Sequence, residues 1–129
     1  MDYFEDLFAT GITCPHKDAF VPDGKQSYFR VLKHNPATSE SFLPTKIKDD
    51  SKIKPDACIA KSVSLSDSLE GLLNAYFRTP AHRKKRLIGV LTLTPTDGLL
   101  KQTFAAGHHS WWRSRAFAPE RVIVQAVEA

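Results

Sequence analysis

The segment 107–115 brings together side chains of the types that bind ligands or transfer protons. It contains two histidines, two tryptophans and two arginines, in the order His108, His109, Trp111, Trp112, Arg113 and Arg115. Histidine titrates near neutral pH, tryptophan offers a flat face for stacking, and arginine binds phosphates and carboxylates through paired hydrogen bonds. The segment therefore predicts a ligand site in which His108 or His109 transfers a proton. The alternative is structural, because one tryptophan of such a pair often anchors a core and adjacent residues of a strand face opposite sides.

Four residues elsewhere in the chain are candidates for the same site. Arg30 lies in the middle of an expected strand, where its side chain would either face solvent or bind a phosphate in a cleft. Ser62 and Ser64 are two residues apart and share one face of an extended chain, so both could contact a ribose. Ser64 has an alternative use as the cap of a helix. Glu120, at the start of the last expected strand, is a third candidate for catalysis.

The sequence predicts no metal site. Two adjacent histidines without a second pair of ligands do not match a zinc motif, and the chain contains no His-Glu-x-x-His. A glycine-rich phosphate loop is also absent from the sequence.

A basic run between residues 78 and 86 is the candidate contact for a nucleic-acid partner. It ends in Arg83, Lys84, Lys85 and Arg86. Such a cluster attracts phosphates, but this one lacks the interleaved aromatic residues that stack on single-stranded bases. The alternative, which we favour, is a solvated loop whose charges suit the negative end of the preceding helix.

Hydrophobic patterning predicts the elements that would position these residues. Strands are expected over 27–32, 57–63, 86–94 and 119–127. The main helix is expected over 65–78, because apolar residues recur there with helical spacing after a capping box at 64–67. We also expect an amphipathic helix within residues 1–12 and a polar loop over 45–56, while residues 99–104 fit a strand or a helical turn. The order indicates an α+β fold, in which one main helix packs on a mixed or antiparallel sheet.

Length and composition limit the number of domains, the kind of partner and the location of the protein. With 129 residues, 42% of them hydrophobic and 25% charged, the chain 1–129 fits one folded domain. A formal net charge of +4 favours anionic partners only mildly. No apolar run approaches the roughly 20 residues that span a bilayer, and the N-terminus is acidic where a secretory signal is basic. We therefore expect a cytoplasmic protein without a membrane segment.

The two cysteines show no spacing that predicts a pair. Cys58 lies in an apolar run and is expected to be a small buried hydrophobe. Cys14 lies in an expected loop, two residues before His16. A Cys14–His16 nucleophile is the less favoured interpretation of that spacing.

Several short motifs resemble those of a group of small, uncharacterised bacterial proteins. The matching elements are Tyr28-Phe29-Arg30-Val31, Asn35-Pro36-Ala37-Thr38, Ser62-Val63-Ser64 and Gly107-His108-His109-Ser110-Trp111-Trp112. This resemblance spans about residues 28–127 and implies a shared fold without implying an activity. The order of elements is also similar to that of the ADP-ribosyltransferase-like fold, including toxins of the RES type.

The ADP-ribosyltransferase-like resemblance implies a site for NAD. Similar positions are occupied here by Arg30 on an early strand, by Ser62 or Ser64 at a strand-to-helix junction, and by His109 or Glu120 late in the chain. The chain departs from that pattern because it has no Glu-x-Glu pair. This resemblance therefore concerns the fold level only.

Two function classes follow from the sequence. The first, which we favour slightly, is a binding module that contacts a protein or nucleic-acid partner, as a component of a toxin–antitoxin or mobile-element system or as a homo-oligomer. The alternative is an enzyme that binds a nucleotide or NAD, with Arg30 on the phosphate, the serines on the ribose, and Trp111 or Trp112 on the base. The binding module is favoured because the sequence contains no convincing set of positioned acids and bases.

Overall fold

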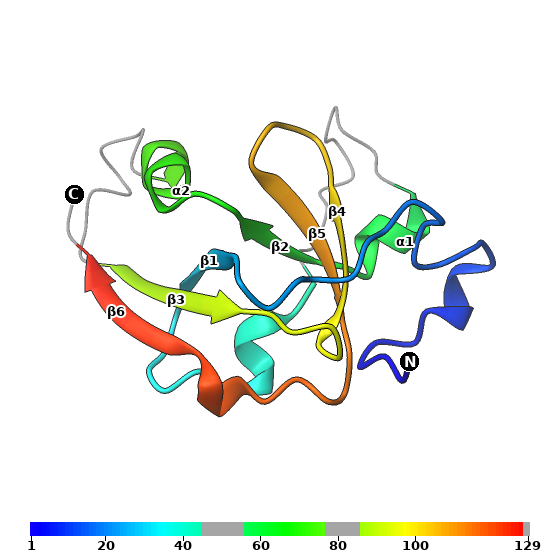
Figure 1. Ribbon diagram of the computed structural model, residues 1–129, viewed down its shortest axis with the longest axis horizontal. Helices are drawn as coiled ribbons and strands as arrows, with labels where there is room; N and C mark the ends of the chain where they lie inside the picture. Colours follow the sequence, from blue (N-terminus) through cyan, green and yellow to red (C-terminus); the bar gives the residue numbers. More distant parts are fainter. Residues whose placement is uncertain (45–55, 77–85, 128–129) are drawn as a thin grey trace.

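The computed structural model describes residues 1–44, 56–76 and 86–127 (Figure 1). Its framework is one six-stranded antiparallel sheet with the strand order β4-β5-β2-β1-β3-β6. The strands are β1 (Ser27–Leu32), β2 (Val63–Ser66), β3 (Arg86–Thr92), β4 (Gly98–Gln102), β5 (His108–Arg113) and β6 (Ile123–Val127). The helical elements are α1 (Ala57–Ala60), α2 (Leu69–Tyr76) and the 3-10 turns η1 (Phe8–Thr10), η2 (Ser39–Phe42) and η4 (Pro119–Arg121).

The expectation of an α+β fold with one main helix over 65–78 is wrong. The described chain forms a small β-rich domain, and α2 covers only eight residues within that range. Leu65 belongs to β2, where it is buried while its neighbours Ser64 and Ser66 are half-buried. Helix α2 begins later than expected because the Ser68 hydroxyl accepts a hydrogen bond from the Gly71 backbone N–H at 3.0 Å. Apolar residues that suggested one long helical stripe therefore belong to two different elements.

Two other expected elements are also different in the structure. Residues 57–63 were expected to form a strand, but Asp56 accepts a hydrogen bond from the Ile59 N–H at 2.8 Å and so caps the short helix α1. The amphipathic helix expected within residues 1–12 is reduced to the turn η1, which ends at Gly11 in the left-handed conformation. Tyr3 instead bridges to Ser114 as an added strand position. The expected polar loop over 45–56 lies outside the described residues except for Asp56.

The remaining strands agree with the sequence. The first strand is confirmed over Ser27–Leu32, and the apolar run at 86–94 forms β3. Residues 99–104, which fitted two alternatives, contribute most of β4 and pair with β5. The last strand begins only at Ile123, because Pro119–Arg121 form a 3-10 turn before it.

The two tryptophans of β5 anchor two cores on opposite faces of the sheet. Trp111 is fully buried with Phe42, Leu91 and Leu100, and its indole N–H donates to the Asp97 carbonyl at 3.0 Å. Trp112 is buried on the other face with Leu7 and Cys58, and its indole donates to the Cys58 carbonyl at 2.9 Å. Both rings therefore stabilise the fold, and they hold the C-terminal half of β5 in place.

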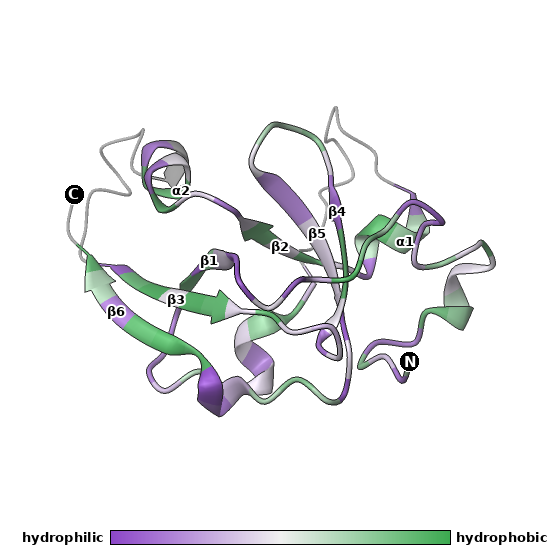
Figure 2. Cartoon of the chain, viewed as in Figure 1, coloured by the Kyte–Doolittle hydropathy of each residue, from purple (hydrophilic) through white to green (hydrophobic). Residues whose placement is uncertain are grey.

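The sheet is nearly divided between β1 and β2. These strands share only the residue pair Phe29–Ser66, whereas β1 and β3 are paired along their whole length from Ser27–Thr92 to Leu32–Leu87. Figure 1 shows β2 and β5 turning away from β1 and β3 at this point. We call this place the β1–β2 junction. Figure 2 shows hydrophilic colour at the beginning of β5, which is the end of that strand paired with Ser66.

Cys14 and Cys58 form a disulfide, so the expectation of two separate cysteines is wrong. The bond joins the loop after η1 to α1 across 44 residues of sequence. His16 reinforces the same contact, since its Nε2 lies 2.6 Å from Oδ2 of Asp56. Structural disulfides persist mainly in oxidising compartments. The bond therefore counts against the expected cytoplasmic location, which stays a prediction.

Reducing this disulfide is expected to lower the free energy of unfolding by about 4 kcal/mol, because it releases a closed loop of intermediate length. The measurement is urea unfolding with and without dithiothreitol, with the double variant Cys14→Ala, Cys58→Ala as a control that dithiothreitol should not affect. Equal unfolding midpoints for the oxidised and reduced wild type would show that the bond contributes no stability.

In the described part of the chain, no helix has the length and apolar character needed to cross a membrane.

Candidate functional site

Arg30 fills the β1–β2 junction. Its side chain donates three hydrogen bonds, all to backbone carbonyls of other segments: Nε to Ser41 at 3.0 Å, Nη1 to Ser64 at 2.8 Å and Nη2 to Leu43 at 3.2 Å. A guanidinium has five N–H donors, so these bonds leave two for a ligand. Arg30 therefore joins β1, β2 and the η2 segment. Its hydrogen bonds hold β1 and β2 together at the place where these strands share only one residue pair.

The charge at the junction is positive. Burial lowers the pKa of Arg30 to about 10, and the positive charge of Arg113 acts in the same direction. The guanidinium is nevertheless protonated at neutral pH. Its three hydrogen-bond acceptors are neutral carbonyls, so none of them cancels its charge. A half-buried cation in this position favours an anionic ligand.

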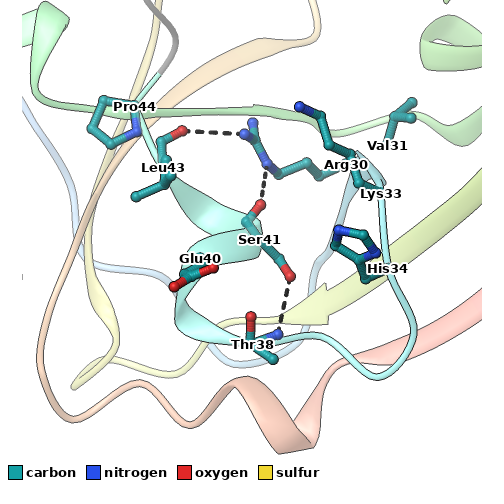
Figure 3. Close-up of a pocket in the computed structure, with 9 residues that line it drawn as sticks. All are labelled: Arg30, Val31, Lys33, His34, Thr38, Glu40, Ser41, Leu43 and Pro44. Atoms are coloured by element: carbon teal, nitrogen blue, oxygen red, sulfur yellow. Dashed lines mark hydrogen bonds between the residues drawn. The ribbon is translucent and has the colours of Figure 1, made fainter.

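One pocket lies beside Arg30 on the side of η2, and we call it the η2 pocket. Its volume is about 400 Å³. Figure 3 shows Arg30, Lys33 and His34 along one side and the η2 residues along the other. The Ser41 hydroxyl accepts a hydrogen bond from the Thr38 N–H at 3.0 Å, which fixes the turn that presents these side chains. One carboxylate, Glu40, also lines the η2 pocket.

A second pocket lies beside Arg30 on the side of α2, and we call it the α2 pocket. Its volume is about 280 Å³. Apolar side chains form much of its wall, including Phe29 from β1, Leu65 from β2 and Leu72 from α2. Its polar lining consists of Arg30, Lys33, Ser64, Ser66 and His108. The two pockets share Arg30, Val31 and Lys33 and therefore adjoin at the junction.

His108 contributes a neutral ring to the α2 pocket. Burial lowers the pKa of His108 below its ordinary value, although a hydrogen bond to Thr103 opposes this shift. Nδ1 lies 3.2 Å from the Thr103 carbonyl oxygen, and because a carbonyl only accepts, Nδ1 carries the proton. The Nε2 atom is then an acceptor at neutral pH. This polarity would suit a hydroxyl or amino group of a ligand.

The structure thus brings together three of the residues expected at a site. Arg30, Ser64 and His108 come from β1, β2 and β5 and all line the α2 pocket. Each lies at the β1–β2 junction or one strand away from it. Their proximity was expected from residue type, and its basis is the order of these strands in the sheet.

Four other expected ligand contacts are buried and engaged elsewhere. Trp111 and Trp112 are at most 1% exposed, so neither can stack on a base. The Ser62 hydroxyl donates to the Ile59 carbonyl at 2.6 Å. Arg113 is 2% exposed, with Nε and Nη2 both 2.8 Å from Oε1 of Glu5, and Phe4 lies over its guanidinium. These four side chains stabilise the fold.

His109 and Glu120 do not join the pockets. His109 lies on the opposite face of β5 from His108, buried against the rings of Phe20 and Tyr28, with Nδ1 at 4.0 Å from Oδ2 of Asp67. Glu120 is exposed in η4 and lines neither pocket. The expected site is therefore divided among three places, and the two pockets described above both lie at the junction.

The basic run is described only at its end. Arg83, Lys84 and Lys85 lie outside the described residues, and Arg86 begins β3 as a half-buried residue paired with Val127. Its interpretation as a nucleic-acid contact stays a prediction. In the described part of the chain, no group of three or more histidine, cysteine, aspartate or glutamate side chains could hold a metal ion.

Sequence reasoning missed the residues that give the pockets their chemistry. Lys33 and His34 directly follow the first strand, and Ser66 is two residues beyond Ser64 on the same face of β2. Ser62, Ser64 and Ser66 are each two residues apart, so this alternation indicates Ser66 as well when the strand is extended to it. The helix expected over 65–78 excluded Ser66 from that pattern. No signal in the sequence indicated that residues 38–43 fold back onto Arg30.

Comparisons of the chain with protein-family models, curated proteins and solved structures found no match.

Proposed function

We propose that this protein binds a small nucleotide-type ligand at the β1–β2 junction. The phosphate would lie in the η2 pocket against Arg30, Lys33 and His34, and the ring system would lie in the α2 pocket. The observation that carries this proposal is that one half-buried guanidinium lines both pockets. ADP is the simplest such ligand, and NAD is the larger one that the resemblance suggests.

Charge and shape support this assignment together. Among the described residues, the lining of the η2 pocket has two cationic side chains and a histidine against a single carboxylate. The α2 pocket is more apolar, and its lining includes no carboxylate from residues 1–44, 56–76 or 86–127. Ligand pockets commonly combine such an apolar wall with a few convergent polar groups. A ligand with an anionic end and a flat, weakly polar end fits the pair better than a free phosphate does.

The proposal concerns binding. His108 is the one imidazole of the α2 pocket and would accept a hydrogen bond from the ligand, and we assign no reaction to it. The partner-binding module of a toxin–antitoxin or mobile-element system stays a prediction, because most of its basic run lies outside the described residues. The exposed aromatic residues Phe4 and Phe8 leave a protein partner or a homo-oligomer as part of that prediction.

Calorimetric titration with ADP tests the proposal. We expect saturable binding by the wild type and a loss of about tenfold in affinity for Lys33→Met, since this change removes one charged phosphate contact. Lys25→Met is the matched control, because Lys25 is exposed and lines neither pocket, so its affinity should equal that of the wild type. The absence of saturable binding of both ADP and NAD at millimolar concentration would refute the proposal.

A further inference from the structure

Phe104 occupies an unfavourable position in the β4–β5 hairpin. Its φ angle is +64°, in the left-handed region that glycine and asparagine enter much more readily than other residues. Its ring is also 54% exposed to solvent. In the described part of the chain it is the one non-glycine residue with positive φ. A strained backbone and an exposed aromatic ring at one residue of a soluble hairpin are features that often accompany a functional contact.

The ring of Phe104 lies next to the α2 pocket. Its centroid is 5.2 Å from that of His108, and the two planes are inclined by 55°. His108 is part of the pocket lining, and it is neutral for the reason given above. Figure 1 shows the tip of the β4–β5 hairpin and α2 rising on the same side of the β1–β2 junction. Phe104 therefore lies beside His108, a residue that lines the α2 pocket.

The lining of the α2 pocket combines apolar side chains with a cation. Phe29, Leu65 and Leu72 provide apolar surface within the α2 pocket, and Arg30 marks its anionic end. An exposed aromatic ring beside the lining residue His108 is suited to stacking on a flat ring, and such stacking tolerates different bases because every base has a π face. We propose that Phe104 is a specificity-determining residue that stacks on the base of the ligand. This inference rests on the proposed function and adds the residue that distinguishes a nucleotide from a bare phosphate.

The geometry also explains why the exposed ring is held at this place. The Gly107 carbonyl accepts a hydrogen bond from the Asp67 N–H at 2.9 Å, which ties the hairpin to the start of α2. The Thr103 hydroxyl lies 2.8 Å from the Ser110 hydroxyl and 3.1 Å from Nδ1 of His108. These contacts fix the backbone on both sides of Phe104. The ring is therefore positioned before a ligand arrives.

The test compares two probes, ADP and pyrophosphate, by calorimetry. Phe104→Ala is expected to weaken ADP binding by about ten- to hundredfold, while pyrophosphate affinity stays at the wild-type value. Phe104→Tyr keeps the ring and should restore ADP binding. Phe8→Ala is the matched control, because Phe8 is 99% exposed and distant in sequence, and it should bind both probes as the wild type does.

A second variant separates stacking from folding. Phe104→Gly provides the residue that the backbone conformation favours, so its thermal midpoint should be at least that of the wild type while ADP affinity falls as in Phe104→Ala. Unchanged ADP affinity in both variants, or an equal loss for ADP and pyrophosphate, would overturn the inference but leave the proposed function in place. A wild-type protein that binds neither ADP nor NAD would overturn the proposed function and this inference with it.

Discussion

Replacing Arg30 by methionine is expected to lower the free energy of unfolding by about 3 kcal/mol and to weaken ADP binding about a hundredfold. The variant leaves three backbone carbonyls, those of Ser41, Leu43 and Ser64, without their donors. A partly buried acceptor left unsatisfied costs about 1–3 kcal/mol. The loss of affinity follows because the same guanidinium lines both pockets. Urea unfolding and calorimetric titration measure the two effects.

Two controls separate stability from binding in this experiment. Lys33→Met should lose affinity without losing stability, since Lys33 is exposed and no hydrogen bond from its side chain holds the described fold. Arg30→Lys keeps the charge but loses the fork of donors, so it should fall between the wild type and Arg30→Met for both quantities. An Arg30→Met variant as stable as the wild type would contradict the role assigned to the three carbonyl bonds.

Replacing Arg113 by methionine is expected to lower the free energy of unfolding by about 3–5 kcal/mol. Its guanidinium is 2% exposed, forms an ion pair with Glu5 at 2.8 Å and donates to the Ser39 carbonyl at 2.6 Å. Removing the guanidinium leaves the Glu5 carboxylate without a counter-charge in a largely buried position, and this is the costly way to break such a pair. The measurement is urea unfolding at neutral pH.

The matched control for this prediction is Arg115→Met. Arg115 lies two residues away with its side chain 62% exposed, and its ion pair with Asp2 spans 3.6 Å, so the change should cost less than about 1 kcal/mol. The double variant Glu5→Leu, Arg113→Met should recover part of the stability, because no charge is then left unpaired. If Arg113→Met and Arg115→Met were equally stable, the buried pair would not hold the N-terminal segment to the sheet.

Arg30 and Arg113 act on the same small element. Arg113 holds the Ser39 carbonyl from one side of η2, and Arg30 holds the Ser41 and Leu43 carbonyls from the other. Phe42, between them, is fully buried against Trp111 and Phe117. The η2 pocket therefore has a rigid floor although it is formed by a connecting segment. Such support is what a binding site on a loop requires.

The sequence predicted the strands better than the helices. Residues 27–32 and 86–92 are apolar and β-branched enough to indicate strands without any knowledge of their partners. Leu65 fits a helical stripe with Leu69 and also the alternation of Val63 with Ser64, and sequence spacing alone could not decide between them. The pairing of β2 with β5 decides between helix and strand, because Leu65 pairs with His109 of β5.

The candidate site was predictable only in its residue types. Arg30, Ser64 and His108 were expected because their chemistry suits a ligand, and the sheet brings them to one pocket. The same criteria also selected Trp111 and Arg113, which are buried because β5 is covered by packed side chains on both faces from His109 to Arg113. The Cys14–Cys58 bond and the carbonyl contacts of Arg30 depend on segments far apart in the chain. No local pattern encodes them.

The measurement that tests the central claim most directly is an amide chemical-shift titration of the uniformly labelled wild type with ADP. We expect saturable changes concentrated at Phe29 to His34, at Thr38 to Leu43 and at Ser64 to Ser66, the backbone segments that line the two pockets. Smaller changes are expected at Phe104 and His108, and none at the distant Phe8. Saturable changes confined to another surface, or no saturation at millimolar ADP, would contradict a nucleotide site at the β1–β2 junction.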